Sequence, residues 1–298
     1  MVSPESREYL RQLRETPSFG AGGFNLEELR LCMAARREPA DSAVQCLPVE
    51  LGSVSGEWVL APGADPDARL LYLHGGGYVS GSGAYYLALA AHLSAAAQCA
   101  VLLPDYRLAP EHPFPAGLED CVQAHEWLTV TGPAGAAPAK ATFIAGDSAG
   151  GGLTLATLLA LRDRQLPLPR AGVALSPFAD LTLTGESIRS EAGLDPIMHP
   201  RCLPEFVARY VADSEVRAPL ASPVFGDYTG LPPLLIQVGE HEVIRDDSVL
   251  VAAKARADGG DVTLEVWEGM FHVFQSHEPL LPEGREAIER IASVMRPG

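Results

Sequence analysis

Short runs of β-branched and leucine residues alternate with longer segments of helical periodicity through the middle and C-terminal parts of the chain. A short buried run bounded by turn residues is typical of a strand, and apolar residues three or four positions apart are typical of a helix. The predicted strands are residues 69–73, 100–103, 141–145, 171–175, 234–238 and 262–266, and the predicted helices lie near 84–97, 116–130, 149–163, 246–258 and 285–295. This alternation predicts a mostly parallel central sheet with helices on both faces.

Two segments do not follow this alternation. Residues 1 to about 40 have the pattern of two amphipathic helices, and residues 182 to about 217 have a helical pattern between two strands. Their apolar residues at helical spacing are Tyr9, Leu10, Leu13, Leu26, Leu29 and Met33 in the first segment, and Ile197, Phe206, Val207 and Tyr210 in the second. Either these residues only pack on the nearest core, or the two segments meet as a lid over the sheet edge where open α/β folds bind ligands.

Composition and charge exclude several classes of protein. With 298 residues, 47% hydrophobic and 20% charged, the chain can bury a sizeable core, so it is neither disordered nor fibrous. Its net charge of −16 repels phosphate backbones and anionic membrane surfaces. We therefore expect no nucleic-acid partner and no membrane partner.

The cysteines and the N-terminus indicate a cytoplasmic protein. Five scattered cysteines without a CxxC pair favour neither a disulfide framework nor a zinc site. The first 15 residues mix charged and apolar positions, whereas a secretory signal needs an uninterrupted apolar core. The longest apolar stretch, residues 84–103, is interrupted by His92, Ser94 and Gln98, which predicts a helix followed by a buried strand and not a membrane span.

The motif Gly146-Asp147-Ser148-Ala149-Gly150 matches G-x-S-x-G and lies between a predicted strand and a predicted helix. Glycines beside the serine permit a tight turn from strand to helix, which projects the serine hydroxyl above the sheet. A chance match is expected roughly 0.2 times in a chain of this length, so the flanking strand and helix carry the argument. This context makes Ser148 a candidate nucleophile.

A second glycine motif, His74-Gly75-Gly76-Gly77, follows the predicted strand 69–73. Successive glycines allow backbone N–H groups to surround an oxygen that becomes negative during a reaction. A flexible turn is the simpler interpretation, but the position of this motif before the serine motif favours the chemical one. Nucleotide binding is not indicated, because the chain lacks both G-x-x-x-x-G-K-[ST] and a suitable G-x-G-x-x-G.

A serine nucleophile needs a base, and histidine is the usual one. In the chain order serine, acid, histidine, the base follows the last strand, where His272 and His277 are found. His272 is closer to the strand end and lies among apolar neighbours, so we favour His272 over His277.

The acid is expected after the strand 234–238, where Glu240, Glu242, Asp246 and Asp247 are candidates. The two aspartates also suit the N-terminal cap of the following helix. Spacing alone leaves the choice open. Zinc protease chemistry is excluded because none of the His-Glu pairs has the second histidine of H-E-x-x-H.

Taken together, these motifs resemble those of the hormone-sensitive-lipase-like family of α/β-hydrolases, which includes bacterial carboxylesterases. The resemblance covers residues 45–298, and a further motif within residues 105–116 supports it. The motifs that carry it are His74-Gly75-Gly76-Gly77-Tyr78, Asp105-Tyr106-Arg107-Leu108-Ala109-Pro110-Glu111 with Phe114-Pro115-Ala116, and Gly146-Asp147-Ser148-Ala149-Gly150-Gly151. It implies the α/β-hydrolase fold with a helical cap, made of N-terminal cap helices at 1–45 and an insertion at about 182–217 in a catalytic domain at 46–298.

The resemblance also implies roles for individual residues. Gly76, Gly77 and Ala149 would donate the N–H groups of the oxyanion hole. The family pattern D-x-[LM]-x-D-[DE], aligned on Asp246-Asp247, places Glu242 where the catalytic aspartate would stand, with Glu240 as the alternative acid. Arg107 and Glu111 are expected to form an internal ion pair. The sequence leaves the oligomeric state open, and a homodimer through the sheet edge is one outcome, since family members often dimerise there.

We therefore predict a cofactor-free and metal-free serine carboxylesterase with the triad Ser148, His272 and Glu242. Its partner would be a small-molecule ester of short to medium acyl length, or a lactone. Two other uses of the same scaffold are a lyase or cyclase that acts on a natural product, and a small-molecule receptor. The presence of His272 is evidence against the receptor, because receptors of this kind have lost the base.

Overall fold

The computed structural model describes residues 2–52 and 54–296. An eight-stranded sheet has the order β1-β2-β4-β3-β7-β8-β9-β10. The pairs β3–β4, β3–β7, β7–β8, β8–β9 and β9–β10 are parallel, and β2 is antiparallel to both β1 and β4. The strands are β1 (Gln45–Leu51), β2 (Val54–Leu60), β3 (Asp65–Leu73), β4 (Cys99–Pro104), β7 (Ala141–Asp147), β8 (Ala171–Leu175), β9 (Leu234–Gly239) and β10 (Val262–Trp267).

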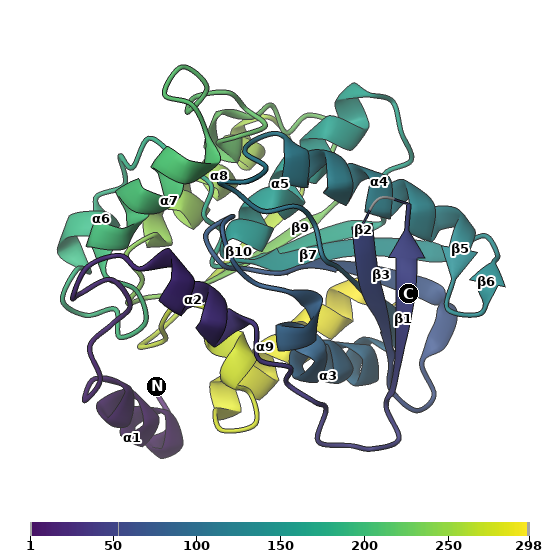
Figure 1. Ribbon diagram of the computed structural model, residues 1–298, viewed down its shortest axis with the longest axis horizontal. Coiled ribbons are helices and arrows are strands. Elements are labelled where there is room, and N and C mark those ends of the chain that lie inside the picture. The colour runs from purple at the N-terminus through teal and green to yellow at the C-terminus, as the bar shows by residue number, and fades with distance from the viewer. Residues whose placement is uncertain (1, 53, 297–298) are drawn as a thin grey trace.

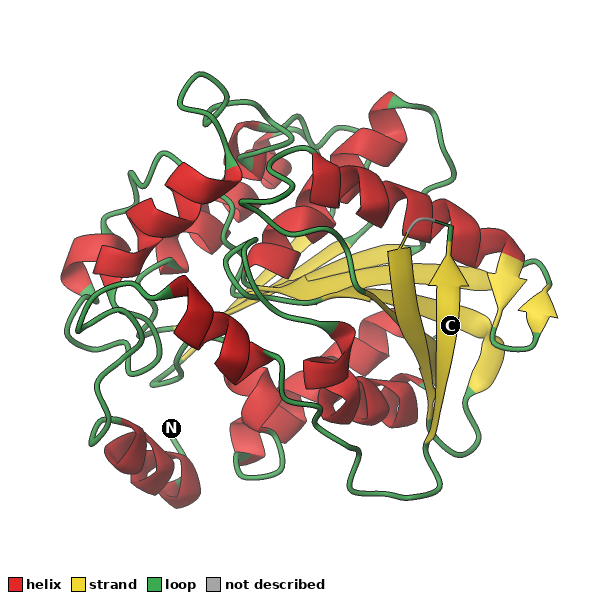
Figure 2. Ribbon diagram, in the orientation of Figure 1, coloured by secondary structure: helices red, strands yellow, loops and turns green. Residues whose placement is uncertain are grey.

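Helices cover both faces of the sheet (Figures 1 and 2). On one face, α4 and α5 pack beside each other and α8 packs on β9 and β10; on the other, α3 packs against α9. Their bounds are α3 (Leu87–Ala97), α4 (Ala116–Val130), α5 (Ala149–Asp163), α8 (Arg245–Ala257) and α9 (Pro282–Met295). This arrangement confirms the predicted α/β class, and each of the six predicted strands and five predicted helices is present within a few residues of its expected bounds.

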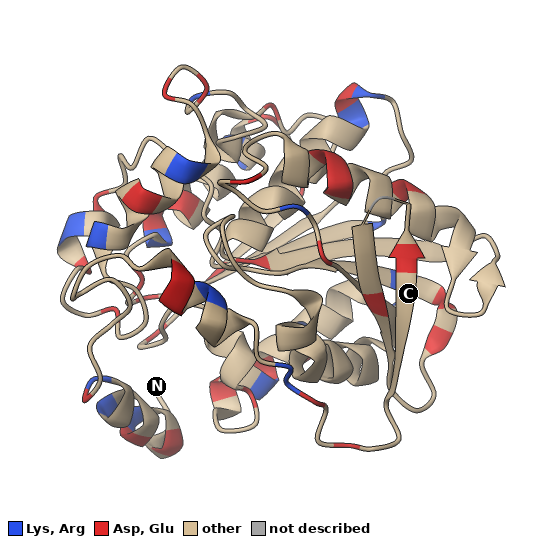
Figure 3. Ribbon diagram, viewed as in Figure 1, with Lys and Arg blue, Asp and Glu red and all other residues tan. Residues whose placement is uncertain are grey.

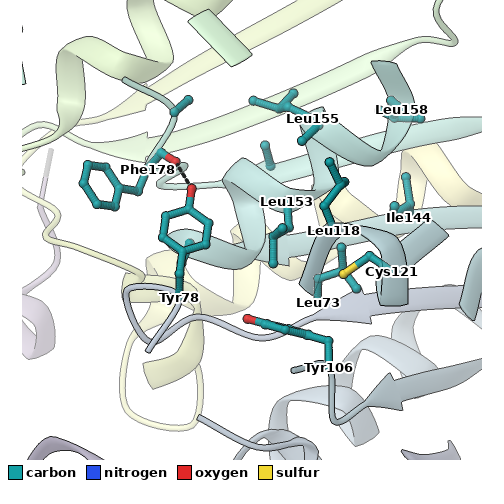
Figure 4. Packing of buried hydrophobic residues seen from close by; sticks show 14 of the residues in the cluster. Leu73, Tyr78, Tyr106, Leu118, Cys121, Ile144, Leu153, Leu155, Leu158 and Phe178 are labelled. Carbon is teal, nitrogen blue, oxygen red and sulfur yellow. Dashed lines mark hydrogen bonds between the residues drawn. The ribbon is translucent and has the colours of Figure 1, made fainter. Parts of the chain in front are cut away.

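Uninterrupted burial explains why the central strands were recognisable from the sequence. Every residue of β4, β8 and β9 is buried, and such strands have continuous apolar runs because helices cover them on both sides. Figure 4 shows the layer between the sheet and α4 and α5, where Leu118 and Leu153 pack near Ile144 of β7. Charged residues lie mainly on the outer helices and loops (Figure 3).

Strands β1 and β2 were not predicted. They form an antiparallel pair at one edge of the sheet, and β1 is mostly exposed, so its sequence lacks the apolar run of a buried strand. The segment 131–140 contains a small hairpin of β5 (Thr131–Gly132) and β6 (Gly135–Ala136).

The two segments outside the alternation contact each other. The N-terminal one contains α1 (Pro4–Leu13) and α2 (Leu26–Met33), as predicted. The second is less helical than predicted: it has α6 (Ser187–Ser190), the 3₁₀ turn η2 (Pro200–Cys202) and α7 (Leu203–Tyr210), joined by loops. Phe19 forms a β-bridge with Met198, and the Phe24 ring packs edge-on against Phe206 of α7, 5.2 Å between centroids. Segments about 180 positions apart in the sequence therefore lie together.

Two smaller expectations are wrong. Arg107 does not pair with Glu111: its guanidinium binds Asp120 of α4 at 2.7 Å, while Glu111 binds Arg30 of α2 at 2.6 Å. The first turn of α4 lies next to Arg107, and α2 packs over the loop that carries Glu111, so each residue has a nearer partner from another element.

The second wrong expectation concerns the aspartates before α8. Ile244, and not an aspartate, occupies the N-cap position of this helix, and Asp246 and Asp247 lie in its first turn. Asp247 instead accepts hydrogen bonds from the backbone N–H groups of Ala179 and Asp180, at 2.8 and 2.9 Å. The pair therefore anchors the segment that follows β8.

Candidate active site

Ser148 lies at the sharp turn between β7 and α5. Its backbone has φ 52° and ψ −119°, an unusual conformation for a residue with a side chain, and its N–H donates to Leu175 O at 2.8 Å. The flanking glycines are required by close packing: a Cβ on Gly146 would lie 2.4 Å from Gly150 O, and a Cβ on Gly150 would lie 2.0 Å from Leu73 O. The turn therefore holds the serine hydroxyl outward from the end of the sheet.

His272 reaches this hydroxyl from the loop after β10. Its Nε2 lies 3.0 Å from Ser148 Oγ, and its Nδ1 lies 2.9 Å from Glu242 Oε2. The histidine is 7% exposed and the glutamate is fully buried. The structure therefore brings the three residues Ser148, His272 and Glu242 into one continuous hydrogen-bonded chain, although they are up to 124 positions apart.

The other candidate acids lie elsewhere. Glu240 accepts a hydrogen bond from the N–H of Gly269 at 2.8 Å and is partly exposed. Asp246 accepts from the N–H of Ser187, at 2.9 Å. Among the acids considered from the sequence, Glu242 is thus the one in contact with His272.

Glu242 is held by groups that the sequence did not reveal. Its Oε1 accepts from the hydroxyl of Ser176 at 2.7 Å and from the N–H of Gly239. Ser176 Oγ also accepts from the N–H of Val273, at 3.1 Å, so this hydroxyl links the acid to the residue after His272. Ser176 directly follows β8, and only its position at the carboxyl end of a strand could have suggested a role.

The pKa of His272 reflects two opposing effects. Burial alone would lower it, because a buried cation loses its hydration. The hydrogen bond and charge of Glu242, with the charges of Asp195 and Asp147, outweigh burial and raise the pKa above the usual 6.5. The surroundings therefore stabilise the imidazolium that forms when His272 accepts a proton.

Gly76 and Gly77 of the glycine motif line the same cavity as Ser148. Gly76 and Gly77 have φ of 120° and 62°, and a Cβ on Gly76 would lie 2.2 Å from Ser80 O, so both positions need glycine. Within residues 2–52 and 54–296, no group accepts a hydrogen bond from the N–H of Gly76, Gly77 or Ala149. Unpaired N–H groups at the wall of a cavity can receive a ligand oxygen.

Asp147, inside the serine motif, fixes the glycine loop relative to the serine. Its carboxylate accepts from the hydroxyls of Tyr72 and Tyr86, each at 2.9 Å, and from the N–H of Gly75 at 3.1 Å. Burial raises its pKa to about 6, although these hydrogen bonds oppose the rise. The motif showed Asp147 as a variable position, and nothing in the sequence indicated its three partners.

A third acid, Asp195, comes from the inserted segment. Its carboxylate accepts from the N–H groups of Ile197, Met198 and Val243, at 2.9 to 3.1 Å, and burial raises its pKa to about 6. Val243 follows Glu242, so Asp195 connects the inserted segment to the loop that holds the candidate acid.

These residues border a cavity of about 440 Å³. Its lining includes Ser148, His272, Gly76 and Gly77. The two segments outside the strand–helix alternation, residues 1 to about 40 and 182 to about 217, also line it, through Phe19, Leu29, Met33, Ile197, Met198 and Phe206. Ligand pockets commonly combine such an apolar lining with a few polar groups.

His277, the alternative base, lies in the same cavity but does not approach the serine. Its Nδ1 is 2.8 Å from the hydroxyl of Tyr9 in α1, and burial lowers its pKa to about 4. His74, of the glycine motif, is buried and stacks on Tyr106 at 4.2 Å between centroids. No three His, Cys, Asp or Glu side chains in the described part of the chain are placed to hold a metal ion.

The raised pKa of His272 predicts how activity depends on pH. Only the neutral imidazole accepts a proton, so kcat/KM for an uncharged ester should fall as the pH drops through the raised pKa, above 6.5. Asp147 and Asp195 lose their charges near pH 6 and steepen this decline. The measurement is a profile of kcat/KM between about pH 5 and 9. An acid limb centred well below pH 6.5 would show that Glu242 does not raise the pKa of His272.

Ser176→Ala should lower kcat about tenfold. The change removes one of the two donors to Glu242 Oε1 and the acceptor of the Val273 N–H, and a hydrogen bond to a charged group contributes about 1.5–3 kcal/mol. The matched control is Ser248→Ala, because Ser248 is also buried but its hydroxyl has no hydrogen-bond partner among the described residues. Equal kcat values for the two variants would rule out this supporting role of Ser176.

Known proteins resemble this chain over most of its length. Residues 70–276 match the family described as the alpha/beta hydrolase fold. An acetyl-hydrolase from Streptomyces hygroscopicus is 45% identical over 248 residues, which cover 83% of this chain and 81% of that protein. A crystal structure of EstE5 soaked with p-nitrophenyl butyrate superposes with a TM-score of 0.91 at 43% identity, covering 99% of this chain and 98% of that one. A crystal structure of an esterase from the bacterial hormone-sensitive lipase family gives 0.88 at 42% identity, with the same coverage.

Proposed function

The chain belongs to the α/β-hydrolase family, in the branch that resembles hormone-sensitive lipase, and is a carboxylic ester hydrolase; we propose that Ser148, His272 and Glu242 catalyse the hydrolysis. The observation that carries this proposal is the hydrogen-bonded chain from Ser148 Oγ through both ring nitrogens of His272 to Glu242. Hydrogen bonds of this kind support the roles of nucleophile, base and orienting acid.

In the first half of the reaction, Ser148 Oγ attacks the ester carbonyl carbon while His272 Nε2 takes the hydroxyl proton. The carbonyl oxygen becomes negative and accepts hydrogen bonds from the N–H groups of Gly76, Gly77 and Ala149. When the tetrahedral intermediate collapses, His272 gives its proton to the leaving alcohol and an acyl group remains on Ser148. Glu242 stabilises the imidazolium throughout.

In the second half, water takes the place of the alcohol. His272 Nε2 removes a proton from the water as its oxygen attacks the acyl carbon, and the same three N–H groups stabilise the oxyanion. The carboxylic acid leaves as Ser148 recovers its proton. No cofactor or metal enters this scheme.

We propose that residues 1–45 and the insertion at about 182–217 form the cap of this site. Support comes from the contacts of Phe19 with Met198 and of Phe24 with Phe206, and from both segments lining the cavity. A cavity of about 440 Å³ with this apolar lining suits esters of short to medium acyl length.

A panel of p-nitrophenyl esters from acetate to dodecanoate tests the proposed substrate range. We expect kcat/KM to be highest for short or medium chains and to fall for the longest. A steady rise to dodecanoate would contradict the enclosed pocket.

Mass analysis of the products separates hydrolysis, which yields the free acid and alcohol, from the lyase or cyclase reactions that the sequence left open.

Location and assembly stay predictions. All five cysteines are free thiols, which supports a reducing compartment such as the cytoplasm. Among the described residues, no helix is both long enough and apolar enough to cross a membrane.

A homodimer through the sheet edge is supported by the position of β10 at the end of the sheet with Val266 exposed, and analytical ultracentrifugation tests it.

A further inference from the structure

One basic side chain lies in the wall of the cavity that contains Ser148. Of the described residues that line this cavity, Arg37 alone is a lysine or arginine. It belongs to the loop that follows α2, where Figure 3 shows a basic stretch beside the helices α3 and α9. The triad does not use this residue.

Arg37 is held in place at both ends. Its backbone N–H donates to Ala84 O at 3.0 Å. Its guanidinium lies over the ring of Tyr85, 3.6 Å from the centroid, and donates to the tyrosine hydroxyl. Tyr85 lines the same cavity, so the stacked pair forms a fixed part of the wall.

The charge of Arg37 has no carboxylate partner. Its neighbour Arg36 binds Glu57 and Glu38, and Arg30 of α2 binds Glu111 through two bonds. In the described chain no carboxylate oxygen lies within 4 Å of the Arg37 guanidinium, although the protein has a net charge of −16. Arg37 is exposed to solvent and lines the cavity, so its charge is uncompensated by the protein and accessible to a bound substrate.

The charged residues around this cavity differ in sign. Asp147 lines the wall with its carboxylate buried, and Glu242 is buried behind His272. Near Arg37, His277 is held neutral by burial and by the charge of Arg37, with a pKa of about 4. A negative group on the substrate is thus repelled by Asp147 and Glu242 and attracted by Arg37.

We propose that Arg37 binds a carboxylate of the substrate, so that the preferred esters carry a negatively charged group away from the bond that is cleaved. This proposal rests on the proposed function of Ser148. The planar guanidinium suits a carboxylate because it offers two parallel N–H donors, and its stacking on Tyr85 fixes their direction.

The carboxylate can belong to the acid or to the alcohol part of the ester, and two substrate pairs distinguish these sources. On the acid side, mono-p-nitrophenyl adipate is compared with its neutral methyl ester. On the alcohol side, p-butanoyloxybenzoate is compared with its methyl ester. Within each pair the charge of the distal group changes, and any intrinsic difference in ester reactivity is the same for every variant. The change in the kcat/KM ratio from wild type to variant therefore measures recognition of that charge.

Arg37→Gln should lower the ratio of charged to neutral kcat/KM about tenfold for at least one pair. Arg37→Glu should lower it further, because a like charge then repels the carboxylate. Arg36→Gln is the matched control: it removes the adjacent arginine, whose guanidinium pairs with Glu57 and Glu38, and should leave both ratios unchanged. Raising the salt concentration from about 0.05 to about 0.5 M should reduce the wild-type ratio for the preferred pair.

Ratios that do not change in Arg37→Gln and Arg37→Glu, for both pairs, would overturn this subsite while neutral esters were still cleaved. Loss of all ester cleavage in the wild-type protein would instead contradict the proposed function. Circular dichroism and melting temperatures of the variants show whether each is folded, and the charged-to-neutral ratio is independent of the fraction of active enzyme.

Discussion

Replacing Ser148 by alanine should reduce kcat for p-nitrophenyl butyrate by about 10⁴- to 10⁶-fold. The serine oxygen is the atom that attacks the ester, and no other hydroxyl in the described chain lies within hydrogen-bond distance of His272 Nε2. The oxyanion N–H groups and the cavity remain, so a small rate above that of water should persist.

The fold should survive this substitution. Ser148 adopts a strained backbone conformation, and alanine has the same steric limits, so we expect a melting temperature within a few degrees of the wild type. Ser248→Ala, which removes a buried hydroxyl without a hydrogen-bond partner in the described chain, controls for loss of a serine. Turnover by Ser148→Ala near the wild-type rate would mean that another residue is the nucleophile.

Glu242→Gln should lower kcat by about 10⁴-fold, the loss typical of a triad acid. The amide has no charge to stabilise the imidazolium, and it no longer opposes the effect of burial, so the pKa of His272 should fall. The residual activity should therefore show its acid limb at lower pH than the wild type. Both kcat and the pH profile are measured with a neutral ester.

Glu240→Gln is the matched control for this substitution. Glu240 lies two positions away, is partly exposed and binds the Gly269 N–H instead of the histidine. We expect it to retain activity within a few fold of the wild type. The opposite result, with Glu240→Gln inactive and Glu242→Gln active, would show that Glu240 is the acid of the triad.

The buried strands could be predicted because burial on both faces gives their sequences a run of apolar residues. Residues 171–175 and, apart from Gln237, residues 234–238 are apolar, and all are buried, as is typical of a strand between two helical layers. The strands β1 and β2 lack such a pattern, since the edge strand β1 is mostly exposed and is positioned by pairing with β2. The pairing of Leu51 with Val54 makes β1 and β2 a hairpin, and an exposed outer strand of a hairpin has no continuous apolar run that the periodicity could reveal.

The triad residues could be proposed from motif and chain order, but their supports could not. Ser176, Asp147 and Asp195 act through hydrogen bonds to residues that are distant in the sequence, and an isolated serine or aspartate gives no sign of its partner. The predicted ion pair of Arg107 and Glu111 was wrong for the same reason, because each residue pairs with a residue of another element.

The central claim is that the hydroxyl of Ser148 is activated by His272, and covalent capture tests it most directly. The wild-type protein is treated with a fluorophosphonate probe, and the labelled residue is identified by peptide mass spectrometry, with His272→Ala treated in parallel. We predict one label, on Ser148, formed rapidly in the wild type and at least about 10³-fold more slowly in the variant. A label on a different residue, or equal labelling rates in the two proteins, would contradict the account.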